Sequence, residues 1–493
     1  MNAWGRIGNI SPQESRKVQN TRLHRFLNHY LYPFSLFYRR LLDAHGIDPR
    51  RIRTVEDLRH IPLTSKKDFI DPRDPEKFKE FILRPDAASL KASYPKPRLC
   101  GLKLRSLVQA PGWFEHRLEE EFRPCFITFT TGTTHSPVPY VYTRHDIANL
   151  HLSGARMLDL FSVKSSEYLL NMFPYAPHLA FWQVVFGGLS AHTLILSTGG
   201  GKVMGTEGNI AALLKMRPAV IIGVPSFVYH VLRVAREQNC RLDFVRHVVL
   251  GAMGVTSAFK KKVAALLEDM GARQVSVFGT YGFTEARTAW AECPSPHNDP
   301  SGYHLYPDKE IFEVINPETG EVKGEGEDGE LVYTSLDSRG SPVLRFRTGD
   351  MVRGGIRHDP CPHCGRSVPR ISSDITRLSD VKEFRVTKVK GSLVNLSNFS
   401  DVLSSFGEIE EWQIELTKKD NDPYEIDQLA VFVSARQGTR QDDLKEAIRR
   451  RLLLKTEVSA NRVEFVPLKE MVRRLGLETS GKERRVLDRR PQA

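Results

Sequence analysis

The feature that most constrains the fold is a regular alternation of short apolar segments with amphipathic segments between residues 126 and 290. The apolar segments have the length of buried strands and occupy residues 126–130, 167–173, 192–196, 219–224, 247–250 and 274–278. Apolar residues at helical spacing occupy residues 209–216, 226–237 and 257–270. Strands that alternate with helices predict a twisted, largely parallel sheet covered by helices. This part of the chain is therefore expected to be α/β.

The flanking segments have a different texture. Residues 15–120 are polar, helical at first and then rich in proline, whereas residues 305–375 are rich in turns and short strands. Beyond residue 380, short strands surround one helix at 442–454. We predict a large N-terminal α/β domain, residues 1–379, with parallel or mixed sheets covered by helices. A small α+β C-terminal domain, residues 380–493, follows it.

Composition narrows the class of protein. The 493 residues are 40% apolar and 26% charged, which excludes a disordered chain. The net charge of +12 suggests anionic partners, and small molecules that carry phosphate groups explain it as well as nucleic acid does. Nucleic acid is the less favoured partner, because the sequence contains no recognisable module in which basic and aromatic residues alternate. No apolar run reaches the ~18–20 residues of a membrane span, and the first thirty residues lack a signal-peptide core. We therefore expect a cytoplasmic protein.

A glycine flanked by hydroxyl residues follows the first apolar strand. The run is Thr130, Thr131, Gly132, Thr133 and Thr134. Backbone N–H groups and short hydroxyls around a glycine can wrap a phosphate chain at close range. The run lacks the Gly-Lys-Ser/Thr of a P-loop, and a solvent loop explains it equally well when it is taken alone.

Polar residues also occur where later strands end. Thr284 and Glu285 offer a hydroxyl and a carboxylate that can hold Mg²⁺ against phosphate oxygens, although a helix start explains the pair better in isolation. Asp350 is suited to accept hydrogen bonds from a vicinal diol such as ribose, and a capped turn is an equal alternative. Gly481 gives Lys482 the freedom to reach a site on another domain, although a basic tail is the simpler explanation.

The order and spacing of these motifs resemble the adenylate-forming superfamily, which comprises acyl-CoA synthetases, peptide-synthetase adenylation domains and luciferases. The chain is most similar to its phenylacetate–CoA ligase branch, over nearly the whole length. Further segments that carry the resemblance are residues 33–39, 55–68, 223–227, 329–336 and 345–350. The resemblance implies an enzyme that uses ATP and Mg²⁺ to convert a small carboxylic acid, aryl or hydrophobic, to an acyl-adenylate. The acyl group then passes to coenzyme A.

Alternatives remain open within this resemblance. A carrier-protein thiol or an amine can replace coenzyme A as the acceptor, and the resemblance is compatible with a homodimer. A non-catalytic nucleotide-binding relative is disfavoured because Glu285, Asp350 and Lys482 are all present. Neither nucleic acid nor a membrane is an expected partner.

The resemblance also implies roles for single residues. Residues 130–134 would form the phosphate loop, and Thr284 and Glu285 would hold the α-phosphate and Mg²⁺. Lys482 would contact the acyl carboxylate and the α-phosphate, and it would withdraw when the mobile C-terminal domain swings about a hinge near residues 380–382. The residues implied to line the adenine and ribose sites are Gly251, Ala252, Tyr281, Gly282, Asp350 and Arg377.

The chain departs from the family pattern at several positions. His135 replaces a glycine of the phosphate loop, Val138 replaces a lysine found in many relatives, and Met253 replaces a carboxylate beside the adenine slot. The expected hinge, residues 376–380, also differs from the usual Gly-Arg-x-Asp-Asp. These changes fall in the phosphate loop, the adenine slot and the hinge, and they leave intact the residues implied to handle Mg²⁺, ribose and the acyl-phosphate.

Cysteines point to a separate metal site. Cys361 and Cys364 form a Cys-x₂-Cys turn, which needs a second pair of ligands to bind zinc. Cys293 and His304 offer such a pair, and the resemblance supports a structural Zn²⁺ on this set. The alternative histidine ligands are His297 and His363. A redox Cys-x₂-Cys is disfavoured because no helix is expected to begin there.

The segment at residues 173–182 is rich in aromatic side chains. It precedes a glycine pair where relatives place part of the acyl pocket, which favours an aryl or medium-sized hydrophobic acid. Aromatic residues at this density are also common in ordinary cores. His178 is a candidate for contact with a polar substituent of the acid.

Overall fold

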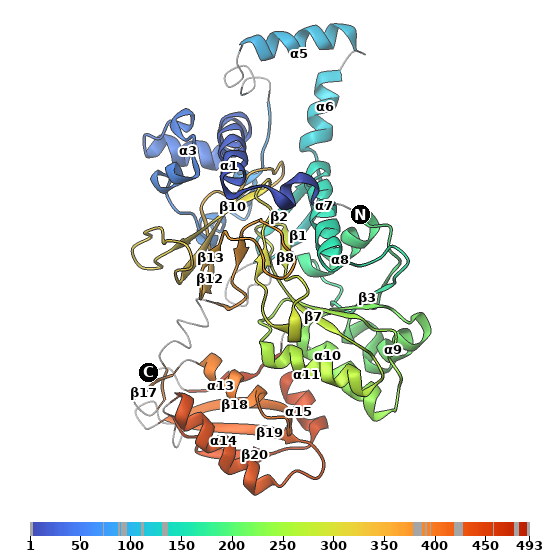
Figure 1. Ribbon diagram of the computed structural model, residues 1–493. Coiled ribbons are helices and arrows are strands. Elements are labelled where there is room, and N and C mark those ends of the chain that lie inside the picture. The colour runs from blue at the N-terminus through green and yellow to red at the C-terminus, as the bar shows by residue number, and fades with distance from the viewer. Residues whose placement is uncertain are drawn as a thin grey trace.

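The computed structural model describes residues 3–71, 73–86, 89, 96–109, 113–130, 137–377, 387–389, 392–394, 396–418, 427–456, 458–477 and 483–490. These residues confirm a mixed α/β fold, with a large body built on several sheets and a smaller group of elements from the C-terminal part of the chain (Figure 1). Among them, no helix combines the length and the apolar character that crossing a membrane requires.

A six-stranded sheet carries the alternating pattern, in the order β4-β3-β5-β6-β7-β8. All neighbours are parallel except β7 and β8, which pair antiparallel. The strands are β3 (Leu169–Asn171), β4 (Ile195–Ser197), β5 (Val220–Gly223), β6 (His247–Leu250), β7 (Ser276–Phe283) and β8 (Thr288–Ala291). The associated helices are α7 (Arg144–Leu160), α8 (Leu179–Ser190), α9 (Gly201–Met216), α10 (Pro225–Glu237) and α11 (Ser257–Asp269). Buried aliphatic side chains of the strands and helices form one continuous core.

One predicted strand does not join this sheet. β1 (Pro124–Phe129) pairs antiparallel with β2 (Pro139–Thr143) in a sheet of its own. The physical reason is the short connection between the two strands, because antiparallel neighbours need only a loop whereas parallel neighbours need a long crossover. Thr130, the first residue of the hydroxyl-rich run, directly follows β1.

A second sheet, in the order β10-β11-β12-β15, is antiparallel throughout. Its strands are β10 (Glu310–Ile315), β11 (Gly329–Ser335), β12 (Phe346–Val352) and β15 (Ile375–Arg377). A smaller sheet contains β9 (Tyr303–His304), β13 (Ile356–Arg357) and β14 (Arg370–Ile371). This region has the turns and short strands expected for residues 305–375.

Helices of the N-terminal region pack on these sheets and share a second core with them. They are α1 (Pro12–Phe26), α2 (Tyr32–Phe34) and α3 (Leu36–Ala44). Ser11 and Glu14 form a capping box that starts α1. Two further helices, α5 (Lys96–Val108) and α6 (Trp113–Phe122), project from the body at the top of Figure 1.

The C-terminal part of the chain forms its own sheet, in the order β20-β19-β18-β21. Its strands are β18 (Ile409–Lys418), β19 (Asp427–Ala435), β20 (Arg462–Phe465) and β21 (Val486–Asp488), and a separate hairpin joins β16 (Thr387–Val389) to β17 (Ser392–Val394). The helices are α13 (Leu396–Ser404), α14 (Gln441–Thr456) and α15 (Leu468–Leu475). Two apolar clusters within this unit are separate from those of the body. Lys262 of α11 bridges the two parts by donating to the carbonyl of Ile409 at 2.6 Å.

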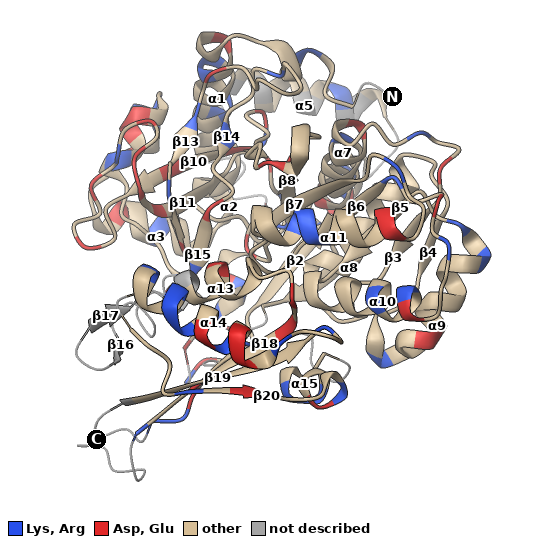
Figure 2. Ribbon diagram, turned by 60° about the horizontal axis from the view of Figure 1, so that its bottom comes forward, with Lys and Arg blue, Asp and Glu red and all other residues tan. Residues whose placement is uncertain are grey.

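Charged residues are spread over the described surface. In Figure 2, ribbon segments of basic residues and of acidic residues both occur on α9, α10 and α14.

The buried imidazole of His247 makes stability dependent on pH. His247, at the start of β6, is 8% exposed, and burial lowers its pKa from 6.5 to about 4. As the pH falls, His247 therefore binds a proton near pH 6.5 in the unfolded chain but only near pH 4 in the folded chain. Stability from this group is complete above pH 6.5 and is lost as the pH falls through this window.

The free energy of unfolding should fall between pH 7 and pH 4.5 in both wild type and His247→Gln. We expect the fall to be smaller in His247→Gln, and the difference between the two falls to be up to about 3 kcal/mol. Urea unfolding at the two pH values measures the difference. His116→Gln, on exposed α6, is the control and keeps the wild-type dependence. Equal pH dependence of His247→Gln and wild type would contradict the role given to burial.

Candidate functional site

Three residues singled out for the nucleotide site meet at one end of the second sheet. The hydroxyl of Tyr281 donates to Asp350 Oδ2 at 2.7 Å, and Arg377 Nη1 lies 3.2 Å from Asp350 Oδ1. Asp350 on β12 and Arg377 on β15 are direct partners in the strand register. Burial and the neighbouring Asp350 carboxylate raise the pKa of Tyr281, so its hydroxyl stays protonated and able to donate. The two carboxylate oxygens of Asp350 are thereby fixed in orientation.

Glu285 lies in the tight connection between β7 and β8. Its side chain is 9% exposed, and burial raises the pKa of the carboxyl group, while the charges of Arg377 and Lys66 lower it. The nearby charge of Asp350 also raises the pKa of Glu285. Glu285 is therefore a carboxylate held in a largely water-free place near the Tyr281–Asp350 pair, where a cation would be strongly attracted.

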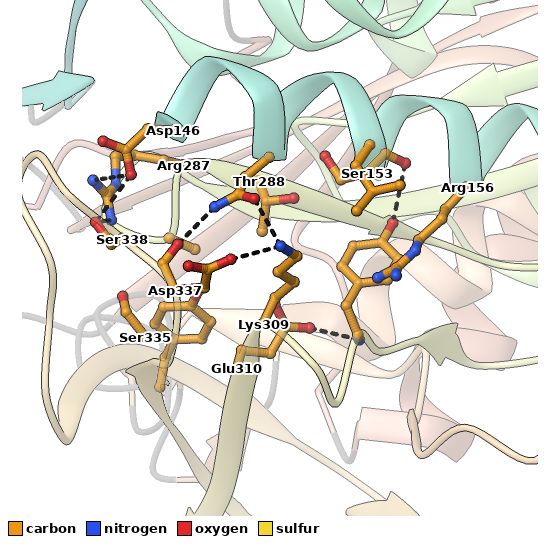
Figure 3. A pocket seen from close by; sticks show the side chains of 15 residues that line it. Asp146, Ser153, Arg156, Arg287, Thr288, Lys309, Glu310, Ser335, Asp337 and Ser338 are labelled. Atoms are coloured by element: carbon orange, nitrogen blue, oxygen red, sulfur yellow. Dashed lines mark hydrogen bonds and ion pairs between the residues drawn. The ribbon is translucent and has the colours of Figure 1, made fainter. Parts of the chain in front are cut away.

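Sequence reasoning missed the residues that support the Glu285 turn. Arg287, two residues after Glu285, donates from Nη1 to Asp146 Oδ1 at 3.4 Å and from Nη2 to Ser338 Oγ at 2.5 Å (Figure 3). Asp146 also accepts hydrogen bonds from the backbone N–H of Thr143 at 2.9 Å and of Gly340 at 2.7 Å. The Thr143–Asp146 capping box signals only a helix start in the sequence.

The cavity drawn in Figure 3 lies beside this support. Its volume is about 40 Å³, and Asp146, Arg287, Lys309 and Glu310 are among the residues that line it. Sites for small molecules usually occupy about 300–1,000 Å³. The cavity therefore has room for water but not for a nucleotide.

Glycines shape the predicted adenine slot at the ends of β6 and β7. A Cβ on Gly251 would lie 2.2 Å from Thr280 Oγ1, so no side chain fits there. Thr280 Oγ1 donates to the carbonyl of Leu250 at 3.0 Å and ties the two strand ends together. Ala252 has a positive φ of 69°, which turns the chain sharply after Gly251. A Cβ on Gly282 would likewise meet the side chain of Ala289 at 2.8 Å.

Several predicted site residues lie outside the described part of the chain. They are Thr131, Gly132, Thr133, Thr134 and Lys482, together with the expected hinge at 380–382. Thr130 is described: its N–H donates to the carbonyl of Val138 at 3.1 Å, and its Oγ1 accepts from the N–H of Val138 at 3.1 Å. Thr130 and Val138 thus close the base of the hydroxyl-rich loop.

The four residues of the predicted metal set come together. Their ligand atoms, from Cys293, His304, Cys361 and Cys364, all lie within 4.8 Å of one another. The sulfurs of Cys293 and Cys361 are 3.6 Å apart, and Cys364 Sγ lies 3.2 Å from His304 Nε2. A tetrahedral Zn²⁺ with bonds of about 2.3 Å separates two sulfurs by about 3.7 Å. The donor set therefore fits zinc in both chemistry and spacing.

Surrounding contacts favour metal binding by this cluster. The ring Nδ1 of His304 lies 3.3 Å from the carbonyl of Ala291, so an N–H at Nδ1 can donate there and leave Nε2 to bind a metal. The hydrogen bond between Cys293 and Cys361 lowers the pKa of the Cys361 thiol and raises that of Cys293. His304 is the histidine that the cluster contains, rather than the alternatives His297 and His363.

The aromatic segment beside the expected acyl pocket packs largely on itself. The Trp182 ring lies 5.2 Å from Phe126 and 5.3 Å from Phe181, with edge-on geometry. His178 Nδ1 lies 3.1 Å from the carbonyl of Phe129, which ties the segment to β1. Tyr175, at 65% exposed, remains open to solvent.

Comparison with known proteins shows the class of protein to which this chain belongs. Residues 72–336, just over half of the chain, match the family model for AMP-binding enzymes, so the chain belongs to that family. It is 27% identical to the phenylacetate-coenzyme A ligase of Thermus thermophilus over 97% of this chain and 98% of that protein. It is 25% identical to the enzyme of that name from Aromatoleum evansii over 99% and 97% of the two chains.

Solved structures show the same fold. A 2-hydroxyisobutyryl-CoA ligase in the postadenylation state superposes with a TM-score of 0.75 at 20% identity, over 98% of this chain and 92% of that chain. The same enzyme in the thioesterification state, with coenzyme A bound, gives a TM-score of 0.59 over similar coverage. These likenesses establish the shared architecture.

Proposed function

We propose that the protein is an ATP-dependent, AMP-forming acid–thiol ligase that makes an acyl-adenylate and transfers the acyl group to coenzyme A. The observation that carries the proposal is the Tyr281–Asp350–Arg377 cluster beside the buried Glu285, within a chain that belongs to the AMP-binding enzymes. Relatives named phenylacetate-coenzyme A ligases that match almost end to end support the acid–thiol ligase class. A boundary between residues 1–379 and 380–493 belongs to the same proposal.

The residues take the following parts in adenylate formation. Asp350 accepts hydrogen bonds from the ribose hydroxyls, with Tyr281 and Arg377 holding its carboxylate in place. The loop at residues 130–134 cradles the phosphates. Glu285 and Thr284 hold Mg²⁺, which when bound neutralises phosphate charge. Gly251 and Ala252 line the adenine slot together with Tyr281, and Gly251 lets the chain pass close to Thr280 there.

Charge explains why these groups are needed. The carboxylate of the acid attacks the α-phosphorus, a bond forms between them, and pyrophosphate leaves with its electron pair. Both reactants are anionic, so positive groups fixed around the α-phosphate lower the barrier. Lys482 supplies such a group to the carboxylate and the α-phosphate, and its withdrawal opens a path for the thiol. The thiol then displaces AMP from the acyl carbon.

The acid is proposed to be aryl or of medium hydrophobic size, and phenylacetate is the first candidate from the relatives. The aromatic residues of the segment 173–182, where relatives are expected to place part of the acyl pocket, support this choice. Coenzyme A is the proposed acceptor, and a carrier-protein thiol or an amine is the second candidate. A homodimer and a cytoplasmic location stay predictions.

ATP–pyrophosphate exchange against a panel of aryl, branched and linear acids tests the proposal. We expect exchange that depends on the acid and on Mg²⁺, and thioester formation when coenzyme A is added. Exchange with an acid but no consumption of coenzyme A would favour the carrier-protein or amine acceptor. A protein that shows no exchange with any acid would contradict the proposal.

Asp350→Asn tests the ribose role. The substitution removes the charge that accepts the ribose hydroxyls, and hydrogen bonds to charged groups contribute about 1.5–3 kcal/mol. We expect the KM for ATP to rise about 10–100-fold in the exchange assay. Asp243→Asn, which loses exposed ion pairs with Arg217 and Arg241, is the matched control. An unchanged KM for ATP in Asp350→Asn would argue against this role.

A structural Zn²⁺ on Cys293, His304, Cys361 and Cys364 is the second part of the proposal. Four protein ligands leave no open position, so the ion would clamp loops together rather than act on the substrate. We expect elemental analysis of the purified protein to find about one zinc per chain. Purified protein that is folded and active but contains no metal would contradict the proposed structural Zn²⁺.

A further inference from the structure

The carboxylate of Glu292 lies directly behind the nucleotide-site motif. Glu292 follows β8 and is 2% exposed. Its Oε2 accepts hydrogen bonds from the backbone N–H of Gly279 and from Lys260 Nζ, both at 2.5 Å. Its Oε1 accepts from Ser373 Oγ at 2.6 Å. One side chain thus joins three segments that are distant in the sequence.

Two of these segments carry nucleotide-site residues. Gly279 immediately precedes the stretch of β7 that holds Tyr281, and Ser373 lies just before β15, which holds Arg377. A Cβ on Gly279 would lie 2.9 Å from Glu292 Oε2, so the close approach of this carboxylate requires glycine. The backbone N–H of Ile375, the first residue of β15, donates to the carbonyl of Ser373 at 3.1 Å. The position of Ser373 therefore influences the position of β15.

The third segment supplies the compensating charge. Lys260 on α11 is 1% exposed and pairs with Glu292, so neither charge faces water. A buried ion pair is weak evidence for stability, because an apolar pair of similar volume often stabilises a core as well. A hydrogen-bonding carboxylate, however, fixes the direction of its donors, which an apolar side chain cannot do.

We propose that Glu292 is a positioning residue of the nucleotide site. By holding Gly279 and Ser373 together, it sets the separation between the strands that present Tyr281 and Arg377 to Asp350. Lys260 supplies the opposite charge beside this carboxylate in the interior. The inference rests on the proposed function only in naming ATP as the ligand whose binding depends on this separation.

Ser373→Ala is the sharpest test, because it removes one hydrogen bond of Glu292 and leaves the ion pair with Lys260 in place. We expect Mg·ATP, measured by titration calorimetry, to bind about tenfold more weakly. The KM for ATP should rise by the same factor, while kcat at saturating ATP stays within about twofold of wild type. A purely structural role would instead lower the active fraction, and with it kcat, at an unchanged KM.

Ser190→Ala is the matched control. Ser190 is also partly buried and donates from Oγ to the carbonyl of His151 at 2.9 Å, but it lies at the end of α8, outside the three joined segments. Its affinity for ATP should equal that of wild type. The double variant Lys260→Met/Glu292→Gln removes both buried charges and should weaken ATP binding more than tenfold.

An affinity for Mg·ATP in Ser373→Ala within twofold of wild type would overturn the proposal, whether or not the double variant folds. Calorimetry needs no carboxylic acid, so it separates this inference from the proposed function. Wild-type protein that binds ATP but exchanges pyrophosphate with no acid would contradict the ligase activity and leave the test of Glu292 intact.

Discussion

Lys482→Ala is expected to reduce acid-dependent ATP–pyrophosphate exchange by about 10²–10³-fold. The reason is electrostatic, since removing one preorganised donor from a developing anionic transition state costs about this factor. The attack of a carboxylate on the α-phosphate brings negative groups together, and the Lys482 ammonium is the charge proposed to offset them. The thioester-forming step, started from a synthetic acyl-adenylate and coenzyme A, should keep most of its rate because the lysine is then withdrawn.

Arg484→Ala is the control for Lys482→Ala. Arg484 is an exposed basic residue two positions further on, so its removal changes the charge of the tail by the same amount. It should leave exchange within about twofold of wild type. Exchange that survives in Lys482→Ala, or that falls equally in both variants, would contradict the role of the lysine.

Loss of the metal cluster is expected to have the largest effect on stability. Cys361→Ser/Cys364→Ser removes two of the four ligands that join the β8–β9 region to the turn after β13. Loss of a structural metal belongs to the substitutions that cost more than about 4 kcal/mol. For a chain of this size we expect the thermal midpoint to fall by about 4 °C or more. The bound zinc should be lost together with it.

Cys125→Ser/Cys240→Ser is the matched control, because neither cysteine belongs to the cluster. This variant should keep its zinc, and its thermal midpoint should change little. A strong chelator should lower the midpoint of wild type and of this control alike, without lowering that of Cys361→Ser/Cys364→Ser further. A cluster variant as stable as wild type would contradict a structural metal.

The parallel sheet was predictable because each of its parallel strands overlaps a short, mainly apolar run in a segment where such runs alternate with helices. Residues 247–250 form β6 with the predicted bounds, and the strand predicted at 219–224 contains β5. The position of β1 was not predictable in the same way. Its apolar run has the same length as the others, and only the pairing with β2 separates it from the parallel sheet.

The candidate site was predictable in its residues but not in its supports. Tyr281, Asp350 and Arg377 stand in motifs, whereas the local sequence marks Asp146 only as part of a helix start and does not mark Glu292 at all. Asp146 accepts from Gly340, which lies 194 positions away, and Glu292 accepts from Ser373, 81 positions away. Such contacts depend on how strands are brought together, which hydrophobic periodicity does not specify.

The most direct test of carboxylate activation follows the oxygen atoms. With phenylacetate labelled by ¹⁸O in both carboxyl oxygens, attack on the α-phosphorus and later displacement by a thiol must leave one label in AMP. We predict acyl-CoA and AMP in equal amounts, with one ¹⁸O in each AMP and none in pyrophosphate. If phenylacetate is not turned over, the acid that gives the fastest exchange takes its place. Thioester formation with unlabelled AMP, or with ADP and labelled phosphate as products, would contradict an acyl-adenylate.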